Sequence, residues 1–212
     1  MKLKKKSLNL YTERYTIKAM INSSEGNKAT IADTAIYLFS IKGYDGVSVQ
    51  EICDAAEITK PTLYYYFKSK RGLLEYITEE YGKKLVGIIK EFLTYEHDFL
   101  KSLTKVLKAE LAFARDNLDF FYLHSAILKS PKNTEQKSVY SSVIQEIDDS
   151  FLEFFTSSAR EFGNMRGKEA LYSEMFHNNV ISSVLLIIEG TVPESEQIIH
   201  QIIHASVYGF AD

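Results

Sequence analysis

The chain has 212 residues, of which 45% are hydrophobic and 25% are charged, and its net charge is −3. This is the composition of an ordinary globular protein, and it excludes a disordered or fibrous chain. The single cysteine, Cys53, excludes an internal disulfide and suits a reducing compartment. No stretch has the apolar length of a membrane span, and no signal-peptide pattern follows the basic start, so we expect a cytoplasmic protein without a membrane partner.

The charge is unevenly distributed along the chain. Residues 1–72 carry 12 Lys and Arg against 7 Asp and Glu, for a net charge of +5, whereas residues 73–212 carry 13 against 21, for a net charge of −8. A basic front third joined to an acidic remainder is expected when only one end of a protein meets phosphates.

Residues 1–27 form a basic N-terminal extension that closes in a turn-like segment, Ser23–Asn27. An extra amphipathic helix and a flexible arm both remain open for this extension. Its lysines could reach the minor groove of DNA, but we expect a solvated chain end instead. These lysines are Lys2, Lys4, Lys5 and Lys6.

Three short helices are predicted between residues 28 and 72. Apolar residues at helical spacing predict the first helix over 28–42, with Gly43 after its end. Ser48 and Glu51 have the spacing of a capping box, which predicts the start of the second helix. Thr59 and Pro61 predict the start of the third helix, because proline is tolerated in a first turn.

The third helix has two different faces. Leu63, Tyr66 and Phe67 form its inward stripe, whereas the other face carries Lys60, Pro61, Tyr64, Tyr65 and Lys68. Successive residues lie 100° apart around a helix, so the three consecutive tyrosines cannot all point inward. A short helix that exposes lysine and phenol groups is suited to a groove of DNA.

The rest of the chain also reads as helices. Ser69 predicts a cap for a long helix that begins near Lys70 and continues to Phe92. Further helical runs are predicted at 97–116, 118–129, 134–162, 168–189 and 193–209. Thr191 and Glu194 suggest a second capping box, with Pro193 in the first turn of the last helix. No strand-like alternation occurs, so the sequence predicts an all-α protein.

The N-terminal run ATIADTAIYLFSIKGYDGVSVQEICDAAEITKPTLYYYFKSKRGLL resembles the DNA-binding domain of the TetR family of transcriptional regulators. The resemblance covers residues 29–76, and three elements agree in order and spacing. These elements are the helix end with Ala35, Leu38, Phe39, Gly43 and Tyr44, the helix start with Ser48, Val49 and Ile52, and the recognition segment Thr62–Lys70. The resemblance implies a helix-turn-helix domain at 28–72 and a larger helical effector-binding and dimerisation domain at 73–212.

The resemblance also implies which residues meet DNA. The helix from Thr59 to Lys68 would lie in the major groove, with Lys60, Pro61, Thr62 and Tyr65 nearest the base edges. Tyr64, Lys68, Lys70 and the helix start at Ser48 and Val49 would hold phosphates. Free N–H groups and the positive dipole end of a helix start favour such phosphate contacts.

Two residues depart from the family pattern. Glu57 stands where glycine is usual in the turn between the second and third helices. If this residue is in the left-handed region, the side chain costs about 1 kcal/mol. Cys53 replaces a small alanine, and we expect it to be an inert, buried thiol and not a redox sensor.

Large aromatic residues are frequent in the C-terminal part and could line an apolar ligand cavity or pack a helical core. The resemblance favours some lining by Phe113, Phe120, Phe121, His124, Phe155, Tyr172, Phe176 and His177. His200 and His204 are spaced to share a metal, but no cluster of further ligands accompanies them, so we expect no metal site. No catalytic constellation or cofactor motif is visible, and we expect no enzyme activity and no cofactor.

The sequence as a whole therefore predicts a homodimeric regulator, most simply a repressor. Its partners would be a near-palindromic double-stranded DNA operator and a small apolar or aromatic effector. The helices at 168–189 and 193–209 carry the apolar runs Val180–Ile188 and Ile198–Ile203 and would form a four-helix interface. The alternative is a helical protein-interaction module that lacks sequence-specific DNA binding.

Overall fold

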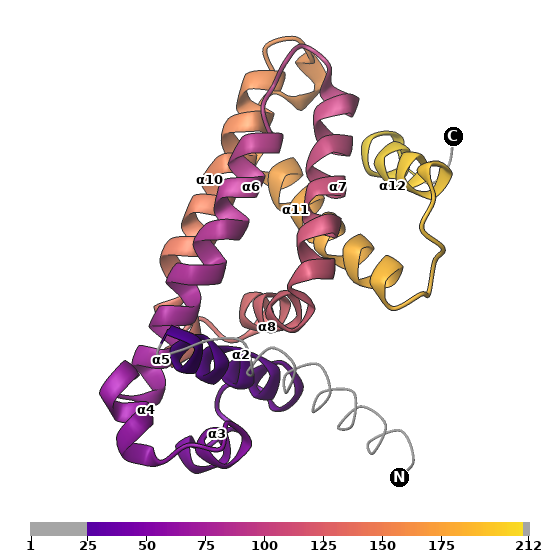
Figure 1. The fold of residues 1–212 in the computed structure, drawn as a ribbon. Helices are drawn as coiled ribbons and strands as arrows, with labels where there is room; N and C mark the ends of the chain where they lie inside the picture. The colour runs from indigo at the N-terminus through magenta and orange to yellow at the C-terminus, as the bar shows by residue number, and fades with distance from the viewer. Residues whose placement is uncertain (1–24, 210–212) are drawn as a thin grey trace. The chain divides into compact units, whose positions relative to one another are not determined.

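The computed structural model describes residues 25–209, and every regular element among them is helical (Figure 1). The all-α prediction is therefore confirmed. The chain divides into two compact units between Ile77 and Thr78. Residues 1–24 of the basic extension, with the four lysines near its start, lie outside the described residues. The choice between an extra helix and a flexible arm falls on these residues as well.

The described part of the first unit, residues 25–77, contains four helices. These are α2 (Glu25–Lys42), α3 (Val49–Ala55), α4 (Lys60–Phe67) and α5 (Lys70–Ile77). Helix α2 packs against α3 and α5, and α4 packs against the same two helices. Their shared core is apolar and contains Ile31, Ala35, Phe39, Ile52, Leu63, Phe67, Leu73 and Leu74. This small core fixes α4 through Leu63 and Phe67.

The predicted start of the first helix is wrong, because α2 begins at Glu25, inside the segment predicted as a turn, but the other predicted helix ends of this unit are confirmed. Gly43 follows α2 with φ of +74°. The Ser48 hydroxyl accepts a hydrogen bond from the N–H of Glu51, and the Glu51 carboxylate accepts one from the N–H of Ser48. Thr59 precedes α4, with Pro61 in its first turn, and the Ser69 hydroxyl accepts a hydrogen bond of 2.9 Å from the N–H of Gly72 at the start of α5.

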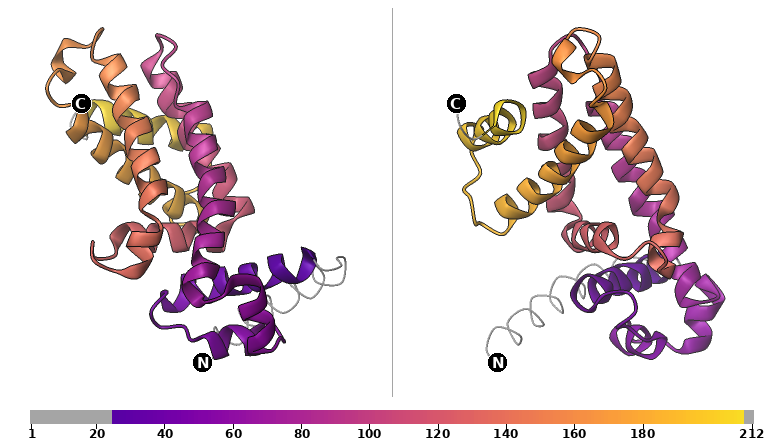
Figure 2. Two further views of the ribbon diagram at one scale, coloured as in Figure 1. Left: turned by 90° about the vertical axis from the view of Figure 1, so that its left-hand side faces the viewer. Right: turned by 180° about the vertical axis from the view of Figure 1, so that it is seen from behind.

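The second unit contains the remaining elements. They are η1 (Thr78–Gly82), α6 (Lys83–Phe92), α7 (Phe99–Asp116), α8 (Leu118–Lys129), α9 (Glu135–Val139), α10 (Ser141–Ser158), η2 (Gly163–Met165), α11 (Glu169–Ile188) and α12 (Glu196–Tyr208). Helices α6 and α10 run side by side, and α11 packs against both α10 and α7 (Figures 1 and 2). Helix α12 packs mainly against α7. Within residues 25–209, no helix is long and apolar enough to cross a membrane.

Three boundaries differ from the sequence prediction. The helix predicted over 70–92 contains a π-helical turn, η1, where Gly82 lies against Val143. The run predicted over 134–162 is interrupted at Tyr140, whose side chain is drawn into the core. The last helix begins at Glu196 and is capped by Ser195, so the proposed Thr191 cap is wrong. The carboxylate of Glu194 pairs with Arg115 instead of capping a helix.

The apolar runs that suggested a dimer interface are largely buried within their own subunit. Val180, Ile181, Val184 and Ile187 of α11 belong to the core, as do Ile199 and Ile203 of α12. The large apolar side chains that α11 leaves exposed are different ones, Leu171, Met175 and Leu186. Leu186 itself belongs to the Val180–Ile188 run, so only the buried members of that run are excluded from a contact with another subunit.

Candidate nucleic-acid interface and ligand pocket

Helix α4 presents one polar and aromatic face to solvent. Lys60, Pro61 and Lys68 are exposed, and the side chain of Tyr65 is 82% exposed. Tyr64 is 45% exposed, so two of the three consecutive tyrosines point outward. The ring of Tyr65 meets the ring of Tyr66 edge to face at 5.1 Å, a contact that supports its position on the surface.

Thr62 lies at the edge of this face. Its side chain is half-buried, and its hydroxyl oxygen is 3.0 Å from that of Thr59, the residue that precedes α4. The two hydroxyls share one hydrogen bond, which leaves each able to make a further one at the helix start. The Thr62 hydroxyl can therefore make a further hydrogen bond at the edge of the exposed face of α4.

The end of α4 is held in an unusual conformation. Lys68 has φ of +63°, a value that favours glycine, and its N–H donates to the carbonyl of Tyr64. Four residues later, a Cβ atom on Gly72 would collide with the carbonyl oxygen of Phe67. Only glycine fits there, so α5 starts close beneath the end of α4.

Lys70 links α5 to the loop before α3. Its ammonium donates hydrogen bonds of 2.9 Å to the carbonyls of Tyr44 and Val47, and it lies 4.2 Å from the centre of the Tyr44 ring. An ammonium has three N–H donors, so at most one remains for a phosphate. The contacts give Lys70 a positioning role for the segment that leads into α3.

The start of α3 is built by its capping box. The exposed Ser48 and the half-buried Val49 stand at this end. The Glu51 carboxylate also accepts a hydrogen bond of 2.8 Å from Lys42, and these hydrogen bonds lower the pKa of Glu51 to about 2. A helix start leaves four N–H groups without intrahelical partners, and the capping box occupies only some of them.

The turn between α3 and α4 passes through Glu57, which has φ of +53°. Glu57 is therefore in the left-handed region, the case in which its side chain costs about 1 kcal/mol. The positive φ strains the backbone because Glu57 has a Cβ atom. Its side chain is exposed, so it is not crowded by neighbours. Together these contacts place α3 and α4 as a pair, with the Lys60–Tyr65 face of α4 outward.

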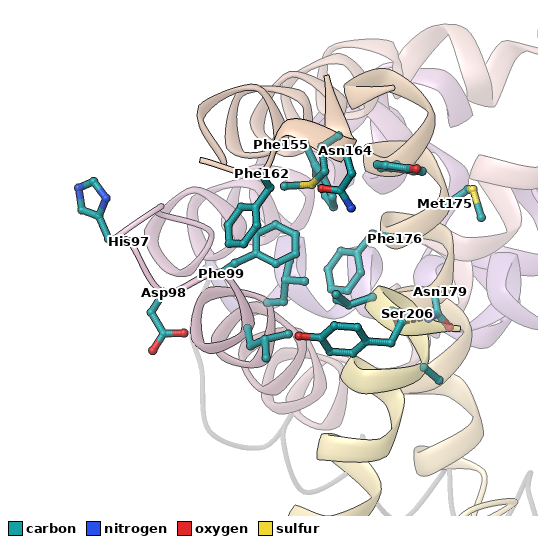
Figure 3. A pocket seen from close by; sticks show the side chains of 17 residues that line it. His97, Asp98, Phe99, Phe155, Phe162, Asn164, Met175, Phe176, Asn179 and Ser206 are labelled. Atoms are coloured by element: carbon teal, nitrogen blue, oxygen red, sulfur yellow. Dashed lines mark hydrogen bonds between the residues drawn. The ribbon is translucent and has the colours of Figure 1, made fainter. Parts of the chain in front are cut away.

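The second unit contains a cavity of about 750 Å³ between α7, α10, α11 and α12 (Figure 3). Phe99, Phe155, Phe162 and Phe176 point toward one another in its apolar part. Its lining is completed by His97, Asp98, Leu100, Leu103, Asn164, Met165, Tyr172, Met175, Asn179, Ala205, Ser206, Val207 and Tyr208. A cavity of this volume and character is typical of a site for a small, largely apolar molecule.

The cavity has polar groups at two places. The Asn179 amide donates a hydrogen bond to the Ser206 hydroxyl and so joins α11 to α12 along one wall. At the other end the polar lining residues are His97 and Asp98. The ring of His97 points away from the phenylalanines (Figure 3), and its Nδ1 is 2.5 Å from the carboxylate of Glu161, which does not line the cavity. Groups of this kind orient a ligand whose main contacts are apolar.

The structure separates the ligand residues predicted from sequence into two groups. Phe155, Tyr172 and Phe176 line the cavity. The other five lie away from it in the buried core and are Phe113, Phe120, Phe121, His124 and His177. Sequence reasoning missed Phe99, Phe162, Met175 and Tyr208, which stand near helix ends or on faces that also meet solvent. The frequency of aromatic residues within a single helix did not indicate that these four residues line the cavity.

A group of buried polar side chains accompanies the aromatic core. His124 and Tyr140 share a hydrogen bond of 2.9 Å, and His177 stacks on Phe151 at 4.7 Å. Burial lowers the pKa of His124 to about 3 and the pKa of His177 to about 4, so both imidazoles are neutral at pH 7. Burial raises the pKa of Glu110 to about 8, and within residues 25–209 its carboxyl oxygens have no hydrogen-bond partner.

These side chains do not form a metal site. No three His, Cys, Asp or Glu side chains gather as ligands within residues 25–209. His200 and His204 stack at 5.9 Å on α12 and have no third ligand in that part of the chain. Cys53 is buried, and burial raises the pKa of its thiol, as expected for an unreactive cysteine.

Comparison with known sequences identifies the first unit. Residues 31–77 match the family described as bacterial regulatory proteins, tetR family. The chain is 29% identical over 142 residues to the probable HTH-type transcriptional regulator YttP of Bacillus subtilis (strain 168), which covers 56% of this chain and 63% of that protein. It is 48% identical over 48 residues to IcaR of Staphylococcus aureus (strain Newman), the biofilm operon icaADBC HTH-type negative transcriptional regulator, over 23% of this chain and 26% of that protein. The chain thus spans less than two thirds of either relative.

Solved structures show the same fold over most of the chain. PfmR of Thermus thermophilus, a TetR family transcriptional regulator, matches with a TM-score of 0.65 and 22% identity over 91% of this chain and 100% of that one. FadR of Bacillus subtilis, solved in complex with stearoyl-CoA, matches with a TM-score of 0.68 and 16% identity over 86% of this chain and 98% of that one. At these identities the likeness shows a common fold.

Proposed function

Because residues 31–77 place this chain in the TetR family of transcriptional regulators, we propose that it is a ligand-responsive repressor. It binds a near-palindromic operator as a homodimer and leaves it when a small, largely apolar molecule fills the cavity of the second unit. The observation that carries the proposal is the two-faced helix α4. Leu63 and Phe67 anchor it in the core, while Lys60 and Tyr65 stand in solvent.

The DNA contacts follow from the exposed face of α4. Lys60, Pro61, Thr62 and Tyr65 are proposed to meet base edges in the major groove, where lysine reads guanine acceptors and apolar atoms read the thymine methyl group. Tyr64, Lys68 and the α3 start at Ser48 and Val49 are proposed to hold phosphates, and Lys70 adds its remaining donor. Phosphate contacts set the position of α4 on the duplex, and base contacts give sequence preference.

The repressor assignment and the effector class draw support from the relatives. IcaR is named a negative regulator, and FadR was crystallised with stearoyl-CoA. In this chain the cavity of about 750 Å³ has four phenylalanines in its apolar part. We therefore favour an effector with an acyl chain or an aromatic group. The pocket is proposed to bind it without turnover, so the ligand should be recovered chemically unchanged.

Release from DNA requires that the effector favours a form of the dimer with a different spacing of its two α4 helices. The segment from Lys70 to Phe92 is the proposed lever, because it connects the two units along the chain through α5, η1 and α6. A π-helical turn such as η1 often marks a functional site in a helix.

Selection of binding sites from random DNA by the purified protein tests this proposal. The expected result is a near-palindrome whose half-sites lie about one helical turn, ~34–36 Å, apart and which binds two subunits. A fatty acyl-CoA or a comparable apolar ligand should then weaken operator binding. Failure to enrich any sequence at low salt would contradict the regulator assignment.

A further inference from the structure

We infer that the cavity takes an uncharged molecule whose apolar body carries a hydroxyl or a carboxamide, and that Asn179 and Ser206 bind this polar group. The inference rests on the proposed function and deepens it, because it names the chemical class of the ligand of the same site. It follows from the hydrogen-bonding capacity of one wall of the cavity and from the character of the rest of the lining.

The polar wall of the cavity is built by one residue each from α11 and α12. Asn179 and Ser206 both line the cavity, and both side chains are half-buried. Figure 3 shows the two side chains close together, at one side of the group of phenylalanines. A ligand whose body lies among the phenylalanines can therefore turn a polar group toward this wall.

The hydrogen bonds that this pair already makes define what it can still bind. The Asn179 amide donates to the Ser206 hydroxyl, which donates in turn to the carbonyl of Ile202 over 2.6 Å. The Asn179 carbonyl oxygen accepts a long hydrogen bond of 3.4 Å from Ser183. An amide nitrogen has two N–H donors, and each of these oxygens has two acceptor positions. By the contacts of the described residues, one N–H of Asn179 remains, with one acceptor position on each of Asn179 and Ser206.

A hydroxyl or a carboxamide matches this wall, because each of these groups both donates and accepts. A carboxylate or an ether only accepts, so it would meet the acceptor positions without a donor of its own. An ammonium only donates and would leave the N–H of Asn179 unpaired. Unpaired polar groups in a binding site cost affinity, so the wall distinguishes these ligands. Among molecules with an acyl or alkyl chain, it favours fatty alcohols and fatty amides over fatty acids and amines.

The apolar part of the cavity is unsuited to a charge. The ring centre of Phe99 lies 5.7 Å from that of Phe155 and 5.5 Å from that of Phe162, and those of Phe155 and Phe176 are 6.1 Å apart. An ion that moves from water into such surroundings loses its hydration, and a close partner of opposite charge is needed to offset that cost.

No such partner lies among the phenylalanines in the part of the chain that the structure describes. Asp98 lines the outer end of the cavity, where its carboxylate accepts a hydrogen bond of 3.0 Å from the N–H of Lys101. Figure 3 shows Asp98 beside His97 and away from the phenylalanines. The lining residues within 25–209 include no lysine or arginine. Lys168 is 5.9 Å from the centre of the Tyr172 ring, but it is exposed and does not itself line the cavity.

Displacement of N-phenyl-1-naphthylamine, an uncharged fluorescent molecule, tests the inference with four ligands that share a decyl chain. These are 1-decanol, decyl methyl ether, decanoate and decylammonium, compared near pH 7. The ether is more apolar than the alcohol, so a cavity without a polar preference binds the ether more tightly. We expect the reverse, with 1-decanol binding about fivefold more tightly than the ether and about tenfold more tightly than either ion.

Two substitutions of Asn179 connect this preference to the wall. Asn179→Leu removes the donor and the acceptor at similar volume, so the alcohol should lose its advantage over the ether. Asn179→Asp leaves only acceptors, so the ratio of affinities should shift about tenfold from 1-decanol toward decylammonium. Asn178→Asp is the matched control, because Asn178 is exposed and lines no part of the cavity. It should keep the wild-type ratios.

Ratios between two competing ligands do not depend on the affinity of the fluorescent molecule, and circular dichroism shows whether each variant is folded. Ser206→Ala removes only a hydroxyl and serves as a second variant of the wall, in which the advantage of the alcohol over the ether should shrink. The inference is overturned if the wild type binds the ether as tightly as the alcohol or binds either ion more tightly. It is equally overturned if the advantage of the alcohol survives in Asn179→Leu and Ser206→Ala.

The four ligands are also added to the protein bound to its selected operator. A protein that binds none of them, by displacement or by a shift in melting temperature, overturns the inference. A protein that releases DNA with the ether or with decanoate as readily as with 1-decanol overturns the inference alone. A protein that binds 1-decanol with the expected preference but never binds a selected operator contradicts the proposed function and leaves the ligand class intact.

Discussion

The hydroxyl of Tyr140 and Nδ1 of His124 share a hydrogen bond of 2.9 Å, and both side chains are buried in the core of the second unit. Tyr140 also lies against Gly82, since a Cβ atom at that glycine would be 3.3 Å from its ring. One residue between α9 and α10 thus joins α8 to the π-helical turn η1.

Removal of the hydroxyl by Tyr140→Phe should lower the free energy of unfolding by about 1–3 kcal/mol, because His124 is left with an unpaired buried nitrogen. Urea unfolding followed by circular dichroism measures this. Tyr122→Phe is the control. The Tyr122 hydroxyl donates a longer hydrogen bond of 3.2 Å to Glu189 near the surface, so its loss should cost less. Equal costs for the two variants would contradict the role given to the Tyr140–His124 contact.

Two glycines within the proposed lever segment, Gly82 and Gly87, should respond to alanine in opposite directions. In Gly82→Ala the new Cβ would lie 2.8 Å from Cγ2 of Val143, so η1 or α10 must shift and the protein is destabilised. In Gly87→Ala, in the exposed middle of α6, nothing lies within 4 Å of the new Cβ. That variant should gain up to about 1 kcal/mol, because alanine has the higher helix propensity.

Thermal unfolding of the two variants checks the prediction. The melting temperature should fall for Gly82→Ala and rise for Gly87→Ala. A gain in both would show that the contact between η1 and α10 relaxes without cost.

At the turn between α3 and α4, Glu57→Gly should stabilise the protein by about 1 kcal/mol, because glycine adopts a positive φ without steric cost. Glu57→Ala is the matched control, since it removes the carboxylate but keeps the Cβ in the left-handed region. It should give no comparable gain. The denaturant midpoints of the wild type, Glu57→Gly and Glu57→Ala test this prediction. Equal midpoints for the two variants would mean that Glu57 destabilises the protein through its charge and not through its backbone conformation.

Local chemistry explains which parts of the fold could be predicted from the sequence. The capping box of Ser48 and Glu51 and the cap at Ser69 involve neighbours within three residues, and both were predicted. The break at Tyr140 and the start of α12 depend on partners far along the chain. Tyr140 is drawn into the core by His124, and Glu194 is engaged by Arg115.

The candidate DNA-binding face could be predicted from neighbouring residues, whereas the cavity depends on residues far apart in the sequence. The exposed face of α4 follows from helical periodicity within eight residues. The cavity walls come from four separate segments, and Met175 and Tyr208 belong to them although both side chains also reach solvent. No pattern within one segment distinguishes such residues from ordinary surface residues.

The buried carboxyl of Glu110 predicts a stability that depends on pH. Burial raises its pKa from 4.5 to about 8, so between these values the folded protein retains a proton that the unfolded chain releases. The wild type therefore loses stability from this group as pH rises, by at most about 1.4 kcal/mol per pH unit. Glu110→Met, which removes the carboxyl at similar volume, should be neutral near pH 4.5 and more stable than the wild type by about 1–3 kcal/mol at pH 8.

Urea unfolding at several pH values measures the difference between Glu110→Met and the wild type. It should widen steadily toward alkaline pH. A difference that is the same at pH 5 and pH 8 would mean that Glu110 is ionised in the folded protein through contacts other than those described above.

The central claim is that the outward face of α4 binds DNA. Its most direct test is the dissociation constant of a selected operator for the wild type and for Lys60→Ala/Tyr65→Ala, measured at fixed low salt. Lys132→Ala, a change at an exposed lysine outside the first unit, is the control. The α4 variant should lose at least tenfold in affinity, since one base contact is worth about 1–3 kcal/mol, and Lys132→Ala should lose none. Unchanged operator affinity of a folded Lys60→Ala/Tyr65→Ala protein would contradict the claim.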